Sequence, residues 1–144
     1  MATLDYKAPI VPGGNFTWAE YARLRAWNTL LVPTAQQMKS AIFLFSNIQT
    51  LIREPLGKPI EISSGARSPE YVRYLRSIRI PAAENGAHNT WEGVDLEPPV
   101  GMPNKQFWQF CARVWPGRME LLNYTPSWVH LDTRQWGKRL RFHP

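Results

Sequence analysis

Prolines limit how far any helix or strand of this chain can extend. There are 13 of them in 144 residues. A proline has no backbone N–H, so it interrupts the hydrogen bonding of a helix interior or of a central strand. The chain is therefore predicted to consist of short elements joined by loops, and the prolines mark the loops.

The segment from Pro33 to Gly57 predicts the clearest helix. Its apolar residues recur at three- and four-residue steps, which places them on one face. Pro33 suits the first helical turn, and Pro55 and Gly57 are expected to end the helix. The apolar stripe consists of Met38, Ala41, Phe45, Ile48 and Ile52. We interpret it as part of the core and not as a cofactor-binding face.

Shorter elements are predicted on both sides of this helix. Thr17 followed three residues later by Glu20 has the pattern of a capping box, and Ser68 before Pro69 has that of a helix start. The expected helices cover 16–27, 33–57, 68–78 and 103–115, and the expected strands cover 58–64, 92–97, 118–123 and 127–132. This order predicts an α+β fold with a small central antiparallel sheet and helices packed on one face.

Composition and length indicate one domain. A chain of 144 residues that is 44% hydrophobic suits a single core, and we expect an extended N-terminal arm over 1–15 and one domain over 16–144. The single cysteine, Cys111, excludes an internal disulfide and a cysteine-based zinc site. No apolar stretch approaches the ~20 residues that span a bilayer. The N-terminus has no signal-peptide pattern, so we expect synthesis in the cytoplasm.

The positive charge narrows the choice of partners only in part. Lys and Arg number 17 against 11 Asp and Glu, a formal charge of +6, which attracts nucleic acid, anionic lipid or the acidic polymers of a bacterial wall. Because the basic residues are scattered and no nucleic-acid motif is present, we expect no specific nucleic-acid binding. The basic C-terminal segment 134–144 is either a solvated strand or a contact with anionic wall polymers.

Two predicted strands carry ionisable residues on the face away from the core. Alternate strand residues share a face, so Asp95 lies opposite its apolar neighbours in 92–97, and His130 and Asp132 do so in 127–132. If these strands are neighbours, Asp95 and His130 converge, and His88 in the preceding loop can reach the same point. Two imidazoles and one carboxylate are a common ligand set for catalytic zinc. From spacing alone, a solvated loop histidine remains the alternative for His88.

Several stretches resemble one family of enzymes. They are GAHNTWEGVD, SWVHLDTRQW, LGKPIEISSGARSPEY and NFTWAEY, which together span roughly residues 15–137. They resemble zinc peptidases of the D-alanyl-D-alanine carboxypeptidase type, which share a fold with lysostaphin-like endopeptidases and the hedgehog signalling domain. The resemblance implies that His88, Asp95 and His130 bind Zn²⁺.

The resemblance also places Arg67, in the stretch SGARSP, near the metal. A guanidinium there would stabilise an oxyanion or hold a substrate carboxylate. The alternative is that Arg67 pins its loop by binding backbone carbonyls. The family's Ser, Gly and Ala around the first ligand are replaced by Gly86, Trp91 and Gly93. We expect Trp91 either to narrow the substrate groove or to cover the sheet edge.

The general base is not indicated by the family pattern. Many relatives place a Glu a few residues before the last His, but residues 123–128 contain no acid. Asp132, on the predicted face of His130, is the first candidate, as a base or as a residue that orients a metal ligand. Glu120 on the preceding strand is the second candidate, and its alternative is a solvated strand residue.

The implied function is zinc-dependent cleavage of an amide bond in the peptidoglycan stem peptide, by a carboxypeptidase or an endopeptidase. Without an export signal, such an enzyme resembles a phage endolysin that reaches the wall through a holin, or a lysin carried on the virion with virion proteins as partners. The alternative is a non-catalytic binding or virion structural module that retains the fold and the zinc.

Overall fold

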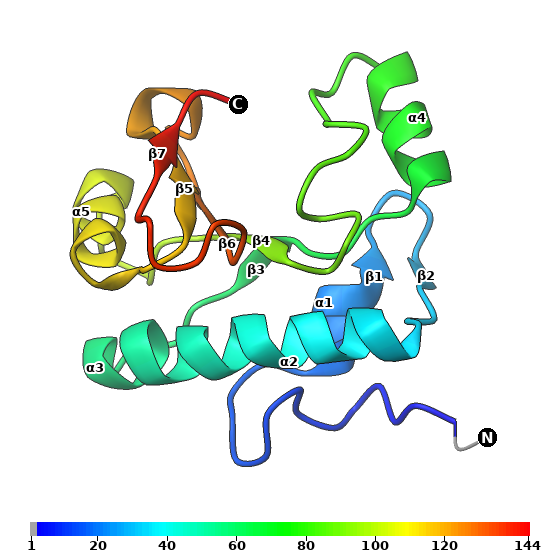
Figure 1. The fold of residues 1–144 in the computed structure, drawn as a ribbon, viewed down its shortest axis with the longest axis horizontal. Coiled ribbons are helices and arrows are strands. Elements are labelled where there is room, and N and C mark those ends of the chain that lie inside the picture. The colour runs from blue at the N-terminus through cyan, green and yellow to red at the C-terminus, as the bar shows by residue number, and fades with distance from the viewer. Residues whose placement is uncertain (1–2) are drawn as a thin grey trace.

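A five-stranded sheet forms the centre of the α+β structure, a computed structural model that describes residues 3–144 (Figure 1). The strands are β3 (Ile62–Ser64), β4 (Gly93–Leu96), β5 (Arg118–Glu120), β6 (Val129–Asp132) and β7 (Arg141–Phe142), in the spatial order β3-β4-β6-β5-β7. The first four pair antiparallel, as the sequence predicts. The C-terminal β7 instead pairs parallel with β5 and adds an edge that the prediction lacked.

The helices lie in the predicted segments but differ from the prediction in their boundaries. They are α1 (Trp18–Ala22), α2 (Ala35–Ile48), α3 (Glu54–Leu56), α4 (Pro69–Ser77) and α5 (Asn104–Val114). The capping box of Thr17 and Glu20 and the Ser68 cap are both present. The predicted helix 16–27 ends early, because the chain turns into a hairpin of β1 (Arg23–Leu24) and β2 (Thr29–Leu30). Among the described residues, no helix has the length and apolar character needed to cross a membrane.

The boundaries of the central helix differ from those expected. Thr34 is the N-cap and forms a capping box with Gln37, so Pro33 lies outside the helix and not in its first turn. At the other end, α2 continues through a π-helical turn (Gln49–Arg53) into α3, and Pro55 lies inside α3. The helix ends at Gly57, whose left-handed φ of 66° suits a glycine.

One face of the sheet packs against a layer of helices. The predicted apolar stripe packs beneath the sheet, with Ala41, Phe45 and Ile48 of α2 and Ile52 of the π-helical turn buried and Met38 partly buried, together with residues of α1 and α5. The sheet residues in this core are Ile62, Val94, Leu96, Met119, Val129 and Leu131. Cys111 of α5 is fully buried in the same core, as predicted.

The helix α4 is not part of this layer. It packs instead on the β1–β2 hairpin, where Leu24, Tyr71 and Leu75 form a second small cluster. In Figure 1, α4 stands across from β5 and β7, beyond the centre of the sheet. This placement differs from a single helical layer and leaves the second face of the sheet open between α4 and the C-terminal strand.

The N-terminal segment runs beneath α2 (Figure 1). Ile10 is buried in the main core, and the Tyr6 hydroxyl donates a hydrogen bond to the backbone carbonyl of Leu31. The side-chain amide of Gln49, in the π-helical turn, exchanges hydrogen bonds with Asn15 at 2.7 and 3.1 Å. These contacts hold the described part of the arm against the helix layer.

Candidate metal centre

Strand pairing brings the predicted ligands together. The strands β4 and β6 pair antiparallel with Asp95 directly opposite His130. Because the residues on either side of them enter the core, both side chains point to the open face of the sheet. The sequence predicts that Asp95 and His130 converge if these two strands are neighbours, and the structure confirms that they are.

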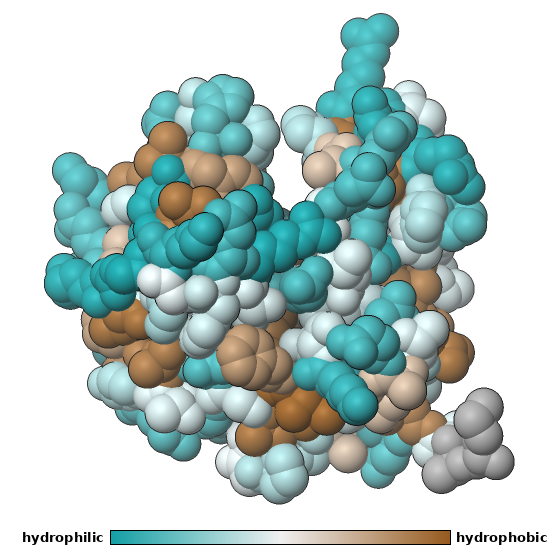
Figure 2. Space-filling view, in the orientation of Figure 1, coloured by the Kyte–Doolittle hydropathy of each residue, from teal (hydrophilic) through white to brown (hydrophobic). Residues whose placement is uncertain are grey.

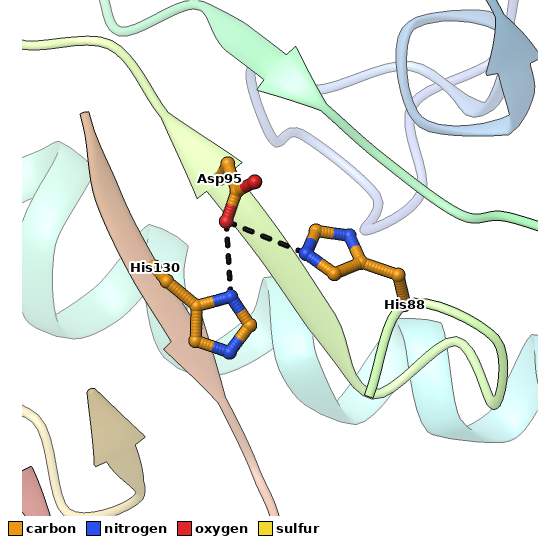
Figure 3. Close-up of side chains that lie close together, drawn as sticks. All are labelled: His88, Asp95 and His130. Carbon is orange, nitrogen blue, oxygen red and sulfur yellow. Dashed lines mark hydrogen bonds and ion pairs between the residues drawn. The ribbon is translucent and has the colours of Figure 1, made fainter. Parts of the chain in front are cut away.

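His88 completes a cluster of three buried side chains (Figure 3). The Nδ1 of His130 lies 2.9 Å from Oδ1 of Asp95, and the Nε2 of His88 lies 3.4 Å from the same oxygen. One ligand atom from each residue falls within 4.8 Å of the other two. The cluster could therefore hold a metal ion.

Each histidine is oriented by a hydrogen bond on its far side. The Nδ1 of His88 lies 2.7 Å from the carbonyl oxygen of Gly65, and the Nε2 of His130 lies 2.8 Å from Oδ2 of Asp132. These acceptors require an N–H on the outward nitrogen, which leaves the lone pair on the nitrogen that faces Asp95 when the imidazole is neutral. Metal-binding histidines in proteins are held in this way. The donor set therefore fits a metal ion.

The loop after β3 provides the carbonyl that orients His88. Its Gly65 packs so closely against α1 that a Cβ atom there would lie 2.1 Å from the carbonyl oxygen of Tyr21. The backbone N–H of Ala66 donates to that oxygen, and the N–H of Arg67 donates to the carbonyl of His88. The stretch SGAR, the end of β3 and the loop that follows it, thus ties His88 to the scaffold.

The loop before β4 brings His88 over the sheet through an unusual backbone. Trp91 adopts a left-handed φ of 62°, which is uncommon for a residue other than glycine. Its side chain is 2% exposed and packs edge-to-face on Tyr21. Trp91 is therefore a core residue, and the expectation that it narrows the groove or covers the sheet edge is wrong.

Arg134 fastens the other side of the same loop. Its guanidinium donates to the carbonyl of Asn85, the hydroxyl of Thr90 and the carboxylate of Glu92. The contacts link the end of β6 to residues on both sides of His88 and limit how far the loop can move.

Asp132 lies behind His130 as seen from Asp95. It has no exposed surface, and its two oxygens accept hydrogen bonds from the Arg118 guanidinium at 2.9 and 3.0 Å. Burial alone would raise the pKa of Asp132, but the bonds from His130 and Arg118 hold it below its usual value. Asp132 is therefore a charged acceptor that fixes His130.

The charges of the cluster depend on one another. Burial opposes ionisation of Asp95, yet the two imidazoles hold the pKa of Asp95 well below its usual range. Burial also lowers the pKa of His130, but the hydrogen bonds to Asp132 and Asp95 raise it to about 10. Without a metal, a proton on His130 Nδ1 thus faces Asp95, and a metal ion would replace this proton.

A cleft of about 690 Å³ opens over the cluster. Figure 2 shows it as a notch between the part of the molecule that carries β5 and β7 and the part that carries α4. The polar side chains that line it are Arg67, Asn85, His88, Asn89, Asp95, Arg118, Glu120, Tyr124, His130 and Arg134. All predicted site residues except Asp132 thus reach one cleft, and Asp132 touches it through His130.

Glu120 and Arg67 differ from Asp132 in being open to the cleft. Glu120 lies on the open face of β5, on the strand next to His130. Burial raises the pKa of Glu120 above its ordinary value, with the imidazoles of His130 and His88 acting against that shift. Arg67 donates to the Ser64 hydroxyl at 2.8 Å, but its buried Nε has no hydrogen-bond partner among the described residues.

Some residues that line the cleft were not predicted from the sequence. Arg118 and Glu120 lie on either side of the buried Met119, so the period-two rule could have placed Arg118 on the open face. Tyr124 and Phe142 also line the cleft. No sequence signal indicates them, because they come from a 3₁₀ turn and from the parallel edge strand.

Two arginines of the basic C-terminal segment, Arg139 and Arg141, have a structural role at the end of α5. Arg139 donates to the carbonyls of Ala112 and Arg113, and Arg141 donates to those of Ala112 and Trp115. These carbonyls belong to the last turn of α5 and its C-cap. Both arginines therefore satisfy the end of that helix, where cations are favourable.

Comparison with known proteins leaves the family open. No protein-family model matches the chain, and no curated protein matches it. The functional interpretation therefore depends on the side chains in the cleft and on the resemblance of short stretches.

Proposed function

We propose that this protein is a zinc-dependent hydrolase that cleaves an amide bond in the stem peptide of peptidoglycan. The supporting observation is the buried cluster of His88, Asp95 and His130, in which each imidazole is oriented from behind and all three ligand atoms face one point below an open cleft. Structural zinc sites are closed by four protein ligands, whereas catalytic sites keep one position for water. Three ligands beside a cleft match the second arrangement.

Zinc held by these residues would lower the pKa of a bound water to about 7 and polarise a substrate carbonyl. Glu120 is the residue that we assign as general base, because it reaches the cleft and its carboxylate is not engaged in an ion pair among the described residues. Burial brings its pKa closer to neutrality, which suits a group that accepts and returns a proton.

Asp132 then has the second of the two roles considered for it. Both of its oxygens are bound by Arg118, and His130 stands between it and the cleft, so it cannot reach a substrate proton. We assign Asp132 as the positioning residue that fixes the His130 ring.

We assign Arg67 to substrate binding. Its guanidinium lines the cleft, and its unpartnered Nε is a donor without a protein acceptor among the described residues. No backbone carbonyl of the described residues accepts from its side chain, which supports the substrate role over loop pinning. A carboxylate or a developing oxyanion of the substrate would complete its hydrogen bonding.

The fold type of the D-alanyl-D-alanine peptidases and the setting of a phage lysin are part of this proposal. The antiparallel strands that carry Asp95 and His130, and the turn that carries Arg67, agree with the stretches that resemble that family. A lysin released with a holin or carried on a virion would meet its substrate in the bacterial wall.

The test is amide hydrolysis of isolated peptidoglycan. Zinc-loaded protein is expected to release new free amines, and His130→Ala is expected to release none. Glu97→Gln removes an exposed carboxylate from the end of β4, outside the cleft, and serves as the control that retains activity. Suppose that the wild type is correctly folded and zinc-loaded but releases no amine over a broad pH range. That result would exclude the hydrolase proposal and favour a zinc-retaining binding module.

A further inference from the structure

A second, smaller cavity lies beside the metal cleft on the other side of Arg67. It encloses about 160 Å³. Its walls come from the β1–β2 hairpin, from β3 with its following turn, and from α4. The polar side chains around it are Arg23, Arg25, Ser63, Ser64, Arg67 and Tyr71, which we call the arginine pocket. Arg67 and Ile80 line both cavities, so the two cavities adjoin.

The arginine pocket concentrates positive charge without a protein counter-charge. Three guanidinium groups line it, and within residues 3–144 no acidic side chain does. None of the three forms an ion pair among the described residues, whereas Arg118 and Arg134 each pair with a carboxylate.

Most hydrogen-bond donors of the three arginines have no protein acceptor among the described residues. Arg23 donates to the side chain of Asn28, Arg25 to the carbonyl of Ile62, and Arg67 to the Ser64 hydroxyl. A guanidinium has five N–H groups, so each arginine keeps donors for another acceptor. The buried Nε of Arg67 also lacks an acceptor among the described residues, and the proposed function assigns it to the substrate group in the metal cleft.

Hydroxyl groups complete the pocket. The oxygen of Tyr71 accepts a hydrogen bond from the backbone N–H of Ala26 at 3.1 Å, so its own hydrogen is free to be donated. Ser63 and Ser64 of β3 also line the pocket. Guanidinium forks with neighbouring hydroxyls are the groups with which proteins bind planar oxyanions.

We propose that the arginine pocket binds a second carboxylate of the peptide substrate, one that is not at the bond being cut. The inference rests on the proposed function, since it takes the substrate to be a stem peptide with more than one carboxylate. The volume of the pocket is about that of five water molecules at ~30 Å³ each, which fits a carboxylate on a short stem. The shared Arg67 places this carboxylate next to the metal cleft and so sets which peptide bond lies over the ligands.

Anion binding without catalysis is the first test. Arginine side-chain N–H signals are followed by NMR in metal-free protein during titration with glutarate and, separately, with inorganic phosphate. We expect saturable shifts of the Arg23 and Arg25 signals with glutarate, at least tenfold weaker binding in Arg23→Gln, and no change in Arg113→Gln, which removes an exposed charge on α5. No saturable shift, or binding of phosphate alone, would overturn the carboxylate assignment.

The same titration in Asp95→Ala separates this proposal from the proposed function. This variant removes a metal ligand but leaves the arginine pocket intact, so glutarate binding is expected to persist. Failure of glutarate to bind the wild type would refute the pocket and leave the hydrolase proposal standing. Binding to a wild type that does not hydrolyse peptidoglycan would refute the hydrolase and keep the pocket.

Substrate kinetics is the second test. Two peptides are compared that differ only in whether the second carboxylate is free or amidated. Amidation is expected to raise the wild-type KM about tenfold, the effect of one lost charge-assisted hydrogen bond, with kcat unchanged. In Arg23→Gln the two peptides should have similar KM values. Equal KM values for the two peptides in the wild type would contradict the proposal.

Discussion

The substitution Asp132→Asn separates positioning of a metal ligand from proton transfer. It keeps the shape of the side chain and removes its charge. In the native protein this carboxylate is fully buried, binds Arg118 through both oxygens, and accepts from His130 Nε2 at 2.8 Å. The amide leaves Arg118 without its counter-charge and allows the His130 ring a second orientation.

Two effects follow from these contacts. Breaking a buried ion pair costs about 3–5 kcal/mol, and we expect the lower end because the Arg118 side chain retains 19% exposure. Loss of an outer hydrogen bond to a metal-binding histidine lowers metal affinity about 10–100-fold. The free energy of unfolding of the metal-free protein and its zinc affinity should therefore both fall.

Competition with a chromophoric chelator measures the zinc affinity, and denaturant unfolding of metal-free protein measures the stability. Glu97→Gln, an exposed carboxylate outside the cleft, is the matched control and should change neither quantity. An Asp132→Asn protein that binds zinc like the wild type but has lost hydrolysis would show that Asp132 transfers the proton. That result would refute the assignment of Glu120.

Three further outcomes are expected. Glu120→Gln should lower kcat about 10²–10⁴-fold without changing zinc affinity. Because burial raises the pKa of Glu120, ionising this carboxyl in the folded protein costs stability. The variant should therefore stabilise metal-free protein at neutral pH, but not at a pH below the ordinary carboxyl pKa. Gly93→Ala places a Cβ 2.8 Å from Ala87 Cβ and 3.3 Å from His130 Cε1, so it should weaken zinc binding in the chelator assay. Burial raises the pKa of the Cys111 thiol, so a thiol reagent should label it only after unfolding; rapid labelling of native protein would contradict its place in the core.

Local rules explain which parts of this fold were predictable. The caps at Thr17 and Ser68 depend on hydrogen bonds within three residues, and both are present as predicted. The faces of Asp95 and His130 follow from alternation along each strand, because their apolar neighbours must enter the core. The metal ligands on the two strands could thus be predicted from the sequence once the strands were assumed to be neighbours.

Contacts between distant segments explain what was not predicted. The pairing of Arg118 with Asp132 depends on the register of β5 and β6, which no local pattern specifies. The burial of Trp91 depends on Tyr21, which is 70 residues away along the chain, and on a left-handed backbone that is unexpected for tryptophan. The position of α4 likewise follows from the hairpin on which it packs.

Zinc stoichiometry tests the central claim most directly. Protein loaded with zinc and dialysed against metal-free buffer is assayed by elemental analysis, with folding checked by circular dichroism. One zinc ion per chain is predicted for the wild type and for Glu97→Gln, and none for Asp95→Ala. A folded wild type that retains no zinc, or an Asp95→Ala protein that retains as much as the wild type, would contradict a metal centre formed by His88, Asp95 and His130.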